Sequence, residues 1–304
     1  MIHSNSEGDI YIEEMPLLLV HLREEEKGAD ARLSEVLSYA LDGYAYETAT
    51  EISAFEDYVN RWRCLEKTQN QKNPVQGRIL FAVPLGTSGI NLELYRLIRF
   101  LREHPDFLNG FVGGLLVDSE NDLYSKSAAK DLVFAANCAG CAFVGRPLVE
   151  GTRTLSNYTI VSNNLGTDLM GAYRESAAGL VKEVLGTDCV RKKCPKVLVL
   201  HASSHKTSNT YAIWNRVKEQ LPEMEIREIG LRNGTLSDCA GCPYKMCLHF
   251  GEQGSCFYGG VMVEDVYPAV READAIVMLC PNYNDALSAN LTAFINRLTS
   301  LFRT

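Results

Sequence analysis

Hydrophobic and polar positions alternate along the first part of the chain in blocks that predict strands followed by helices. Apolar runs of strand length lie at residues 16–22, 46–52, 78–85, 111–117 and 142–148. The segments between and after them have helical spacing, at residues 29–41, 54–65, from about 91, 127–138 and 166–185. In the third helix, for example, Leu94, Leu97 and Leu101 share one face.

After this block a short basic stretch, Thr187 to Pro195 (TDCVRKKCP), reads as a linker, and then the pattern restarts. Strands are expected at 196–200 and 224–229, and a buried strand at 274–280 (DAIVMLC). The helix after the first of these strands places Ile213, Val217 and Leu221 on one face. Two further helices are expected at 265–273 and from about residue 290.

Regular alternation of strands and helices predicts an α/β fold, with parallel sheets covered by helices on both faces. Residues 1–188 hold the five strands of a complete flavodoxin-like, doubly wound domain. Residues 189–304 hold a truncated, three-stranded unit of the same class. Such a sheet leaves an edge that must be covered. We expect the first unit or a second copy of the chain to complete it, and therefore a homo-oligomer.

Composition and charge exclude several classes of partner. The 304 residues carry a formal net charge of −8, which argues against nucleic acid and against an anionic membrane surface. No apolar run approaches the roughly 20 residues that a membrane-spanning helix needs. The first nine residues are polar and contain no apolar segment of a signal peptide, so we expect a cytoplasmic protein.

The loop after the strand at 196–200 has the chemistry of a phosphate site. It reads HASSHKTSNT and offers hydroxyl groups, Lys206 and the start of a helix, whose dipole attracts anions. The alternative is a polar turn with an ordinary helix cap. The first unit differs at its matching turn, because residues 23–27 read REEEK and three glutamates repel phosphate. We therefore expect no FMN phosphate site of this type in residues 1–188.

This loop resembles the phosphate loop of the NAD(P)H-dependent FMN reductases. Pro281 to Leu298 (PNYNDALSANLTAFINRL) is similar to the second loop and helix of that family, and the cysteines between the two motifs resemble those of the related iron-sulfur flavoproteins. The resemblance covers the last 105 residues or so. It departs from the family pattern at Ala202, where the family has glycine, and at Asn296, where it has aspartate.

The resemblance implies FMN as cofactor, NAD(P)H as electron donor and a set of site residues. The FMN phosphate would be held by Ser203, His205, Lys206, Ser208, Asn209 and Thr210. The flavin ring would contact Pro281, Asn282, Tyr283 and Asn284, with Tyr283 as the candidate catalytic residue that shapes the ring site. A solvated turn is the alternative for this second loop. The family's third flavin-side loop has no counterpart in residues 189–304, and residues 117–126 of the first unit could supply it.

Four of the ten cysteines cluster within residues 239–256, at Cys239, Cys242, Cys247 and Cys256. Four thiolates at close spacing can hold a [4Fe–4S] cluster or a tetrahedral zinc ion. The spacing between Cys242 and Cys247 is wider than in the iron-sulfur flavoproteins. His249 also permits a zinc site with three cysteines, and four reduced thiols without metal remain a third possibility.

Taken together, the residues predict an FMN-dependent oxidoreductase. Electrons would pass from NAD(P)H through FMN to a quinone, a free flavin, an organic substrate or an iron–sulfur centre. Its partner would be a small-molecule redox substrate or an electron-transfer protein. Two alternatives stay open: an iron-sulfur flavoprotein that carries electrons for a partner protein, and a non-enzymatic binding or scaffold protein with a degenerate flavodoxin-like fold.

Overall fold

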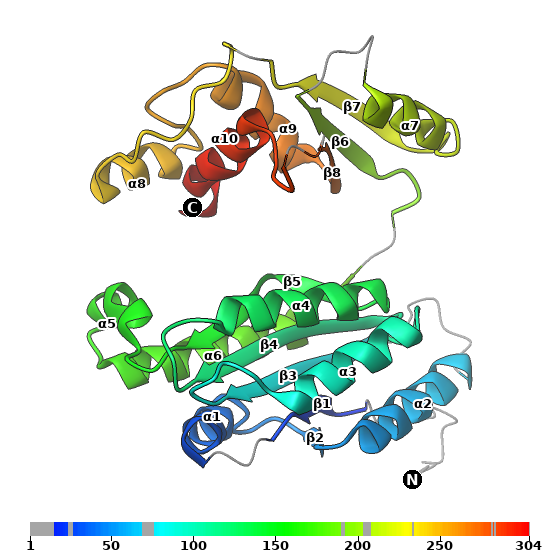
Figure 1. The fold of residues 1–304 in the computed structure, drawn as a ribbon, viewed down its shortest axis with the longest axis vertical. Coiled ribbons are helices and arrows are strands. Elements are labelled where there is room, and N and C mark those ends of the chain that lie inside the picture. The colour runs from blue at the N-terminus through cyan, green and yellow to red at the C-terminus, as the bar shows by residue number, and fades with distance from the viewer. Residues whose placement is uncertain are drawn as a thin grey trace, which may run out of the picture. The chain divides into compact units, whose positions relative to one another are not determined.

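The strands of the chain form two separate parallel sheets (Figure 1). The computed structural model describes residues 15–23, 27–68, 76–189, 192–202, 208–232, 234–280, 282 and 284–303. It divides into two compact units, Met1–Val190 and Arg191–Thr304, and each is described here by itself.

The sheet of the first unit has five parallel strands in the order β2-β1-β3-β4-β5. The strands are β1 (Leu17–His21), β2 (Tyr46–Ala49), β3 (Gly77–Leu85), β4 (Phe111–Ser119) and β5 (Ala142–Gly151). All nine residues of β4 are buried, as expected for an apolar strand with neighbours on both sides and helices on both faces. This order is that of a flavodoxin-like sheet, so the predicted fold class is confirmed.

Helices cover both faces of this sheet and enclose two apolar cores. The helices are α1 (Lys27–Ala40), α2 (Ile52–Thr68), α3 (Leu92–Glu103), α4 (Ser125–Cys138), α5 (Thr159–Leu165) and α6 (Leu169–Gly186). Helices α2, α3 and α4 pack on one face, and α1 and α6 on the other (Figure 1). The predicted face of α3 is buried, and burying each of its leucines stabilises the fold by roughly 1.5–3 kcal/mol.

The linker between the units is fastened at each of its described ends. In its N-terminal part, Asp188 forms an ion pair with Arg78 at 2.9 Å, and the side chain of Gln76 hydrogen-bonds to the backbone of Cys189. In its C-terminal part, the side chain of Lys192 and the backbone N–H of Lys196 donate hydrogen bonds to Asp274. Residues 188–189 are therefore tied to the first unit and residues 192–196 to the second.

The second unit has a three-stranded parallel sheet in the order β7-β6-β8, as the sequence predicts. Its strands are β6 (Lys196–His201), β7 (Glu225–Gly230) and β8 (Ala275–Leu279). Its helices are α7 (Asn209–Lys218), α8 (Tyr244–Glu252), α9 (Tyr267–Glu272) and α10 (Ala289–Arg297), with a π-helical turn before α9 and a 3-10 turn after α10. Helix α8, inside the cysteine-rich segment, was not expected from the sequence.

One expectation about burial in this unit is wrong. Strand β8 lies at the sheet edge, and its residues Ile276 and Met278 are exposed rather than buried. In α7 the side chain directed into the core is Trp214, whereas Ile213 and Val217 are exposed and the helix ends before Leu221. Strand β8 is exposed because none of the described strands pairs with its outer edge.

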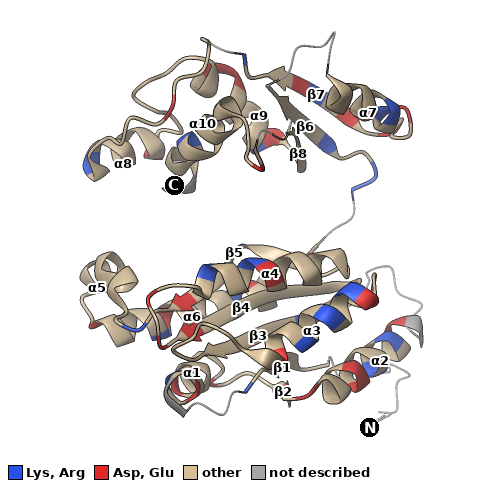
Figure 2. Cartoon of the chain, in the orientation of Figure 1, with Lys and Arg blue, Asp and Glu red and all other residues tan. Residues whose placement is uncertain are grey.

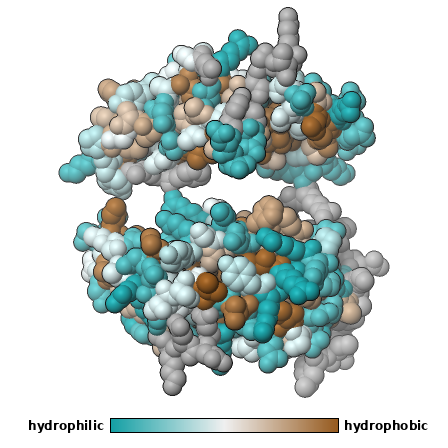
Figure 3. Space-filling model, in the orientation of Figure 1, coloured by the Kyte–Doolittle hydropathy of each residue, from teal (hydrophilic) through white to brown (hydrophobic). Residues whose placement is uncertain are grey.

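The described helices include none with the length and apolar character that a bilayer crossing requires. On the face drawn in Figure 3, hydrophobic residues are interspersed with hydrophilic ones on the surface of each unit.

Candidate functional site

The first half of the predicted FMN site lies where strand β6 gives way to helix α7. Ser203, His205 and Lys206 fall outside the described residues, whereas Ser208, Asn209 and Thr210 form the start of α7. Ser208 has an extended backbone and caps the helix, because its hydroxyl accepts a hydrogen bond from the N–H of Tyr211 at 3.2 Å. The structure therefore brings the three described residues of the predicted phosphate loop together at one helix end.

This helix end has the properties that bind an anion. The N–H groups in the first turn of a helix have no acceptor within the helix, and the helix dipole makes this end positive. In α7 these N–H groups belong to Asn209 and Thr210, next to the hydroxyl of Ser208. A phosphate group fits these donors, so the described part of the loop is compatible with FMN.

Glu228 fixes α7 on the sheet. Its carboxylate on β7 accepts hydrogen bonds from the hydroxyl of Tyr211 at 2.6 Å, from Nζ of Lys218 at 2.7 Å and from the indole N–H of Trp214 at 3.4 Å. Burial opposes ionisation of this carboxyl, but the three donors outweigh it and lower the pKa of Glu228. These contacts hold both ends of α7 and thereby orient its N-terminus.

The second predicted loop leads from the end of β8 to α10. Pro281 and Tyr283 lie outside the described residues. Asn282 donates a hydrogen bond to Asp285 at 3.2 Å, and Asn284 and Asp285 both have left-handed backbone conformations, with φ of 52° and 59°. Two successive left-handed residues make a tight turn, which is a conformation that asparagine and aspartate tolerate.

Leu231, just beyond β7, links the strand before the first loop to the helix after the second. The N–H of Leu231 donates to the carbonyl of His201 at the end of β6, with a distance of 2.7 Å. Its carbonyl accepts from the side-chain amide of Asn290 in the first turn of α10, at 2.6 Å. The carboxyl ends of β6 and β7 and the start of α10 are thus joined, and this is the edge of a parallel sheet at which such folds bind ligands.

Two further residues of this edge were missed by the sequence reasoning. Ser288 is the N-cap of α10, yet its hydroxyl is buried and has no hydrogen-bond partner among the described residues. A buried hydroxyl without a partner is costly, and a bound ligand can supply one. His201 is buried at the end of β6, and its ring lies 5.1 Å from that of Tyr211. The sequence offers one signal for each residue: Ser288 directly precedes a predicted helix, and His201 directly follows an apolar strand.

The cysteine-rich segment is fastened to the other end of α10. The side-chain amide of Asn296 donates to Asp238 at 3.0 Å, and Arg297 donates to Ser237 and to the carbonyl of Gly259. Arg297 is almost fully buried, and its guanidinium binds residues just before and just after the segment. The departure from the family pattern at Asn296 therefore has a structural use in this chain.

The four predicted metal ligands are free thiols in the structure. Cys239 is exposed, and Cys242, Cys247 and Cys256 are half-buried. Within the part of the chain that is described, no three His, Cys, Asp or Glu side chains are grouped as a metal ion requires. The thiols of Cys242, Cys256 and Cys239 raise the pKa of Tyr258, with Cys242 the main cause. Cys247 is not among them and lies on α8, so the assignment of all four as ligands stays a prediction.

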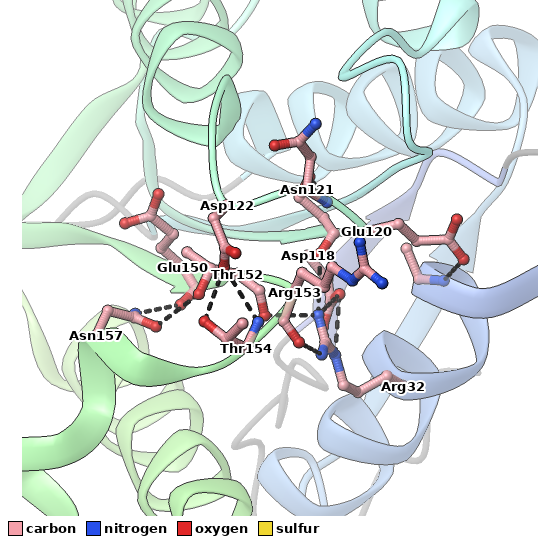
Figure 4. A network of polar contacts seen from close by, with 12 residues as sticks. Arg32, Asp118, Glu120, Asn121, Asp122, Glu150, Thr152, Arg153, Thr154 and Asn157 are labelled. Carbon is pink, nitrogen blue, oxygen red and sulfur yellow. Dashed lines mark hydrogen bonds and ion pairs between the residues drawn. The ribbon is translucent and has the colours of Figure 1, made fainter.

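The corresponding edge of the first unit is crossed by hydrogen bonds between its own side chains and backbone. Asn91 is fully buried and donates to the carbonyls of Leu22 and Pro84, which bridges the ends of β1 and β3. Beside it, residues of the β4–α4 and β5–α5 loops bind one another in the network of Figure 4. Glu24 to Glu26, the basis for expecting no FMN phosphate site here, lie outside the described residues. The flavin-side role expected for residues 117–126 stays a prediction.

Comparison with protein families agrees with the resemblance seen in the sequence. Residues 195–303 match the family model of the NADPH-dependent FMN reductases. This segment contains β6, β7 and β8 and both candidate flavin loops. The match supports an FMN-dependent NAD(P)H oxidoreductase in general and specifies no electron acceptor. Neither the curated proteins nor the solved structures yield a match to this chain.

Proposed function

We propose that the second unit binds FMN at the carboxyl ends of β6 and β8 and passes electrons from NAD(P)H to a small-molecule acceptor or an electron-transfer protein. The observation that carries this proposal is the coincidence of two independent features. Residues 195–303 match the FMN reductase family, and the helix start that would receive the phosphate presents the N–H groups of Asn209 and Thr210 beside the hydroxyl of Ser208.

Each residue has a distinct part in this proposal. Ser203, His205, Lys206, Ser208, Asn209 and Thr210 hold the phosphate, and Pro281, Asn282, Tyr283 and Asn284 contact the flavin ring. When bound, FMN would supply the redox chemistry, which is to accept hydride from NAD(P)H and to pass the electrons on. The chain's own residues bind and orient it: Glu228 fixes the direction of α7, and the left-handed turn at Asn284 and Asp285 sets the course of the ring loop.

The test measures FMN binding by the full chain, with the quenching of flavin fluorescence as the signal. Lys206→Ala should weaken binding about tenfold, because one charge-assisted contact to phosphate contributes roughly 1.4 kcal/mol or more. Ser208→Ala should weaken it several-fold, and circular dichroism reports whether α7 is retained. Lys193→Ala, which removes the same charge from an exposed residue of the linker, should bind FMN as the unaltered protein does. Equal affinity of Lys206→Ala and Lys193→Ala would refute the assignment of the loop.

A metal centre in the cysteine-rich segment is the second candidate feature. Its support is the close spacing of four cysteines within residues 239–256, all of them free thiols in the structure. Iron and zinc analysis of anaerobically purified protein separates the three readings. Iron with sulfide indicates an electron-carrying iron-sulfur flavoprotein, zinc indicates a structural site, and neither metal leaves four reduced thiols.

A non-enzymatic protein with this fold is the remaining alternative. The observation in its favour is that the described sheet of the flavin-bearing unit has three strands, whereas a complete flavodoxin-like sheet has five. Protein that is colourless as purified, and that neither binds added FMN nor oxidises NADH or NADPH in its presence, would replace the oxidoreductase proposal with this one.

A further inference from the structure

Strand β8 is a short sheet edge that carries no charge, proline or bulge to discourage pairing. Among the described strands it pairs only with β6, so one row of its backbone N–H and C=O groups has no neighbouring strand. Its sequence is AIVML, and Ile276 and Met278 are 42 and 43 % exposed. An apolar, uncharged edge of this kind invites another strand.

The other three sheet edges among the described strands are protected. Strand β7 carries Arg227 and Glu228, and Figure 2 shows charges of both signs along it. Strand β2 carries Glu47, which forms an ion pair on the surface. Strand β5 contains Arg146 and Pro147, and its register with β4 is interrupted there. Charge, proline and irregular register all discourage edge pairing, so β8 is the exception within the same molecule.

The two exposed side chains of β8 point to one face of the sheet. Ile276 pairs in register with Leu198, and Met278 with Leu200. Leu198 and Leu200 belong to the core that lies under α9 and α10. Side chains in register on neighbouring parallel strands project to the same face. Ile276 and Met278 therefore continue this core outward, past the last element that covers it among the described residues.

We propose that a second copy of this chain pairs with β8 in antiparallel fashion, about a two-fold axis at Val277, to make one continuous six-stranded sheet. In this register Ile276 lies opposite Met278 of the partner subunit, and the reverse pair is equivalent. Each of the two exposed side chains then gains a cross-strand neighbour from the other copy.

Charge favours a second copy as the occupant. A two-fold axis brings each residue near the axis close to the same residue of the other copy. A charged residue there would therefore lie near a like charge and be repelled. The five residues of β8 carry none, whereas β7 has three charged positions among six. The pairing surface is thus self-complementary, and it does not depend on FMN binding.

The first test is the association state of the full chain by sedimentation velocity over a range of concentrations. The unaltered protein should form dimers, and Met278→Lys should weaken their association at least tenfold, because it places a charge on the pairing edge. Phe134→Lys is the matched control, since Phe134 is an exposed apolar residue on α4 of the first unit. A monomeric unaltered protein, including one whose own first unit covers β8, overturns the proposal, as does a dimer that Met278→Lys leaves intact.

The second test addresses the register. Residues directly opposite in an antiparallel pair have Cβ atoms about 4.5–5.5 Å apart, which a disulfide can accommodate with small adjustment. Val277→Cys should therefore give a disulfide-linked dimer on mild oxidation, beyond any formed by the native cysteines. Ile213→Cys, an exposed position on α7, should not. Equal cross-linking of both variants rejects the two-fold axis at Val277. Loss of FMN binding in a variant that still dimerises concerns the proposed function alone.

Discussion

The guanidinium of Arg32 on α1 binds the carboxylate of Asp118 at the end of β4, with Nη2 and Oδ1 2.6 Å apart (Figure 4). Asp118 is fully buried, and Nε of Arg32 lies 3.0 and 3.1 Å from its two oxygens. The same guanidinium also donates to three backbone carbonyls, those of Ser119, Thr152 and Arg153. One side chain therefore ties α1 to the loops that follow β4 and β5.

Removing Arg32 alone should destabilise the first unit. Burial raises the pKa of Asp118 although Arg32 opposes this, which shows that desolvation of the carboxylate is substantial. Arg32→Met should lower the free energy of unfolding by about 3–5 kcal/mol, because it leaves this buried charge without a partner. The double variant Arg32→Met with Asp118→Leu should lose less, since the uncompensated charge is then gone.

Urea denaturation followed by tryptophan fluorescence provides the measurement. The chain has two tryptophans, the buried Trp62 in the first unit and the buried Trp214 in the second. In a Trp214→Phe background, Trp62 reports unfolding of the first unit alone. Additive losses in the double variant would contradict the account of the pair given above.

Gly151 should not tolerate a methyl group. A Cβ atom at this position would lie 2.7 Å from Oδ2 of Asp118 and 2.8 Å from the ring of Tyr173. Both neighbours are fully buried and cannot move aside, so Gly151→Ala should cost about 1–3 kcal/mol of unfolding free energy in the first unit.

Gly179→Ala is the matched control, because a Cβ there meets nothing within 4 Å and the residue lies inside α6. Alanine is the better helix former, and this change should stabilise the unit by roughly 0.5–1 kcal/mol. Denaturation of the two variants side by side distinguishes crowding at Gly151 from a general effect of replacing glycine. Similar shifts in both would refute the crowding.

Acid should loosen α7 through Glu228. The folded-state pKa of this carboxyl is lowered from its ordinary value of 4.5, because the gain from its three donors exceeds the effect of burial. Its contribution to stability is therefore complete above that ordinary value and is lost as pH falls through the lowered folded value. Glu228→Gln should flatten this part of the stability profile of the second unit.

Fluorescence of Trp214 in a Trp62→Phe background measures this profile, since Trp214 is itself one of the donors. Glu225→Gln is the control, because Glu225 is an exposed carboxylate on the same strand. A profile between about pH 6 and pH 3 that Glu228→Gln leaves unchanged would show that other carboxylates dominate acid unfolding.

The sequence by itself determined the fold class and the chemical character of the candidate site. Apolar runs and helical spacing are local properties, so they identified all eight strands of the described residues, including the five of the first unit, to within a few residues. The phosphate loop was also found locally, because hydroxyls before a helix are a local signal, and Ser208 does cap α7. The family match at residues 195–303 agrees with that reading.

Only the tertiary structure decided which apolar surfaces are covered and which distant residues meet. The run at β8 predicts a buried strand, yet Ile276 is exposed, because periodicity reports that a face is apolar and not whether a neighbour exists to cover it. Likewise, Arg32 and Asp118 are 86 positions apart, and Arg297 holds Ser237 from 60 positions away. Such partners are fixed by the packing of whole elements, about which the spacing of residues along the chain carries no information.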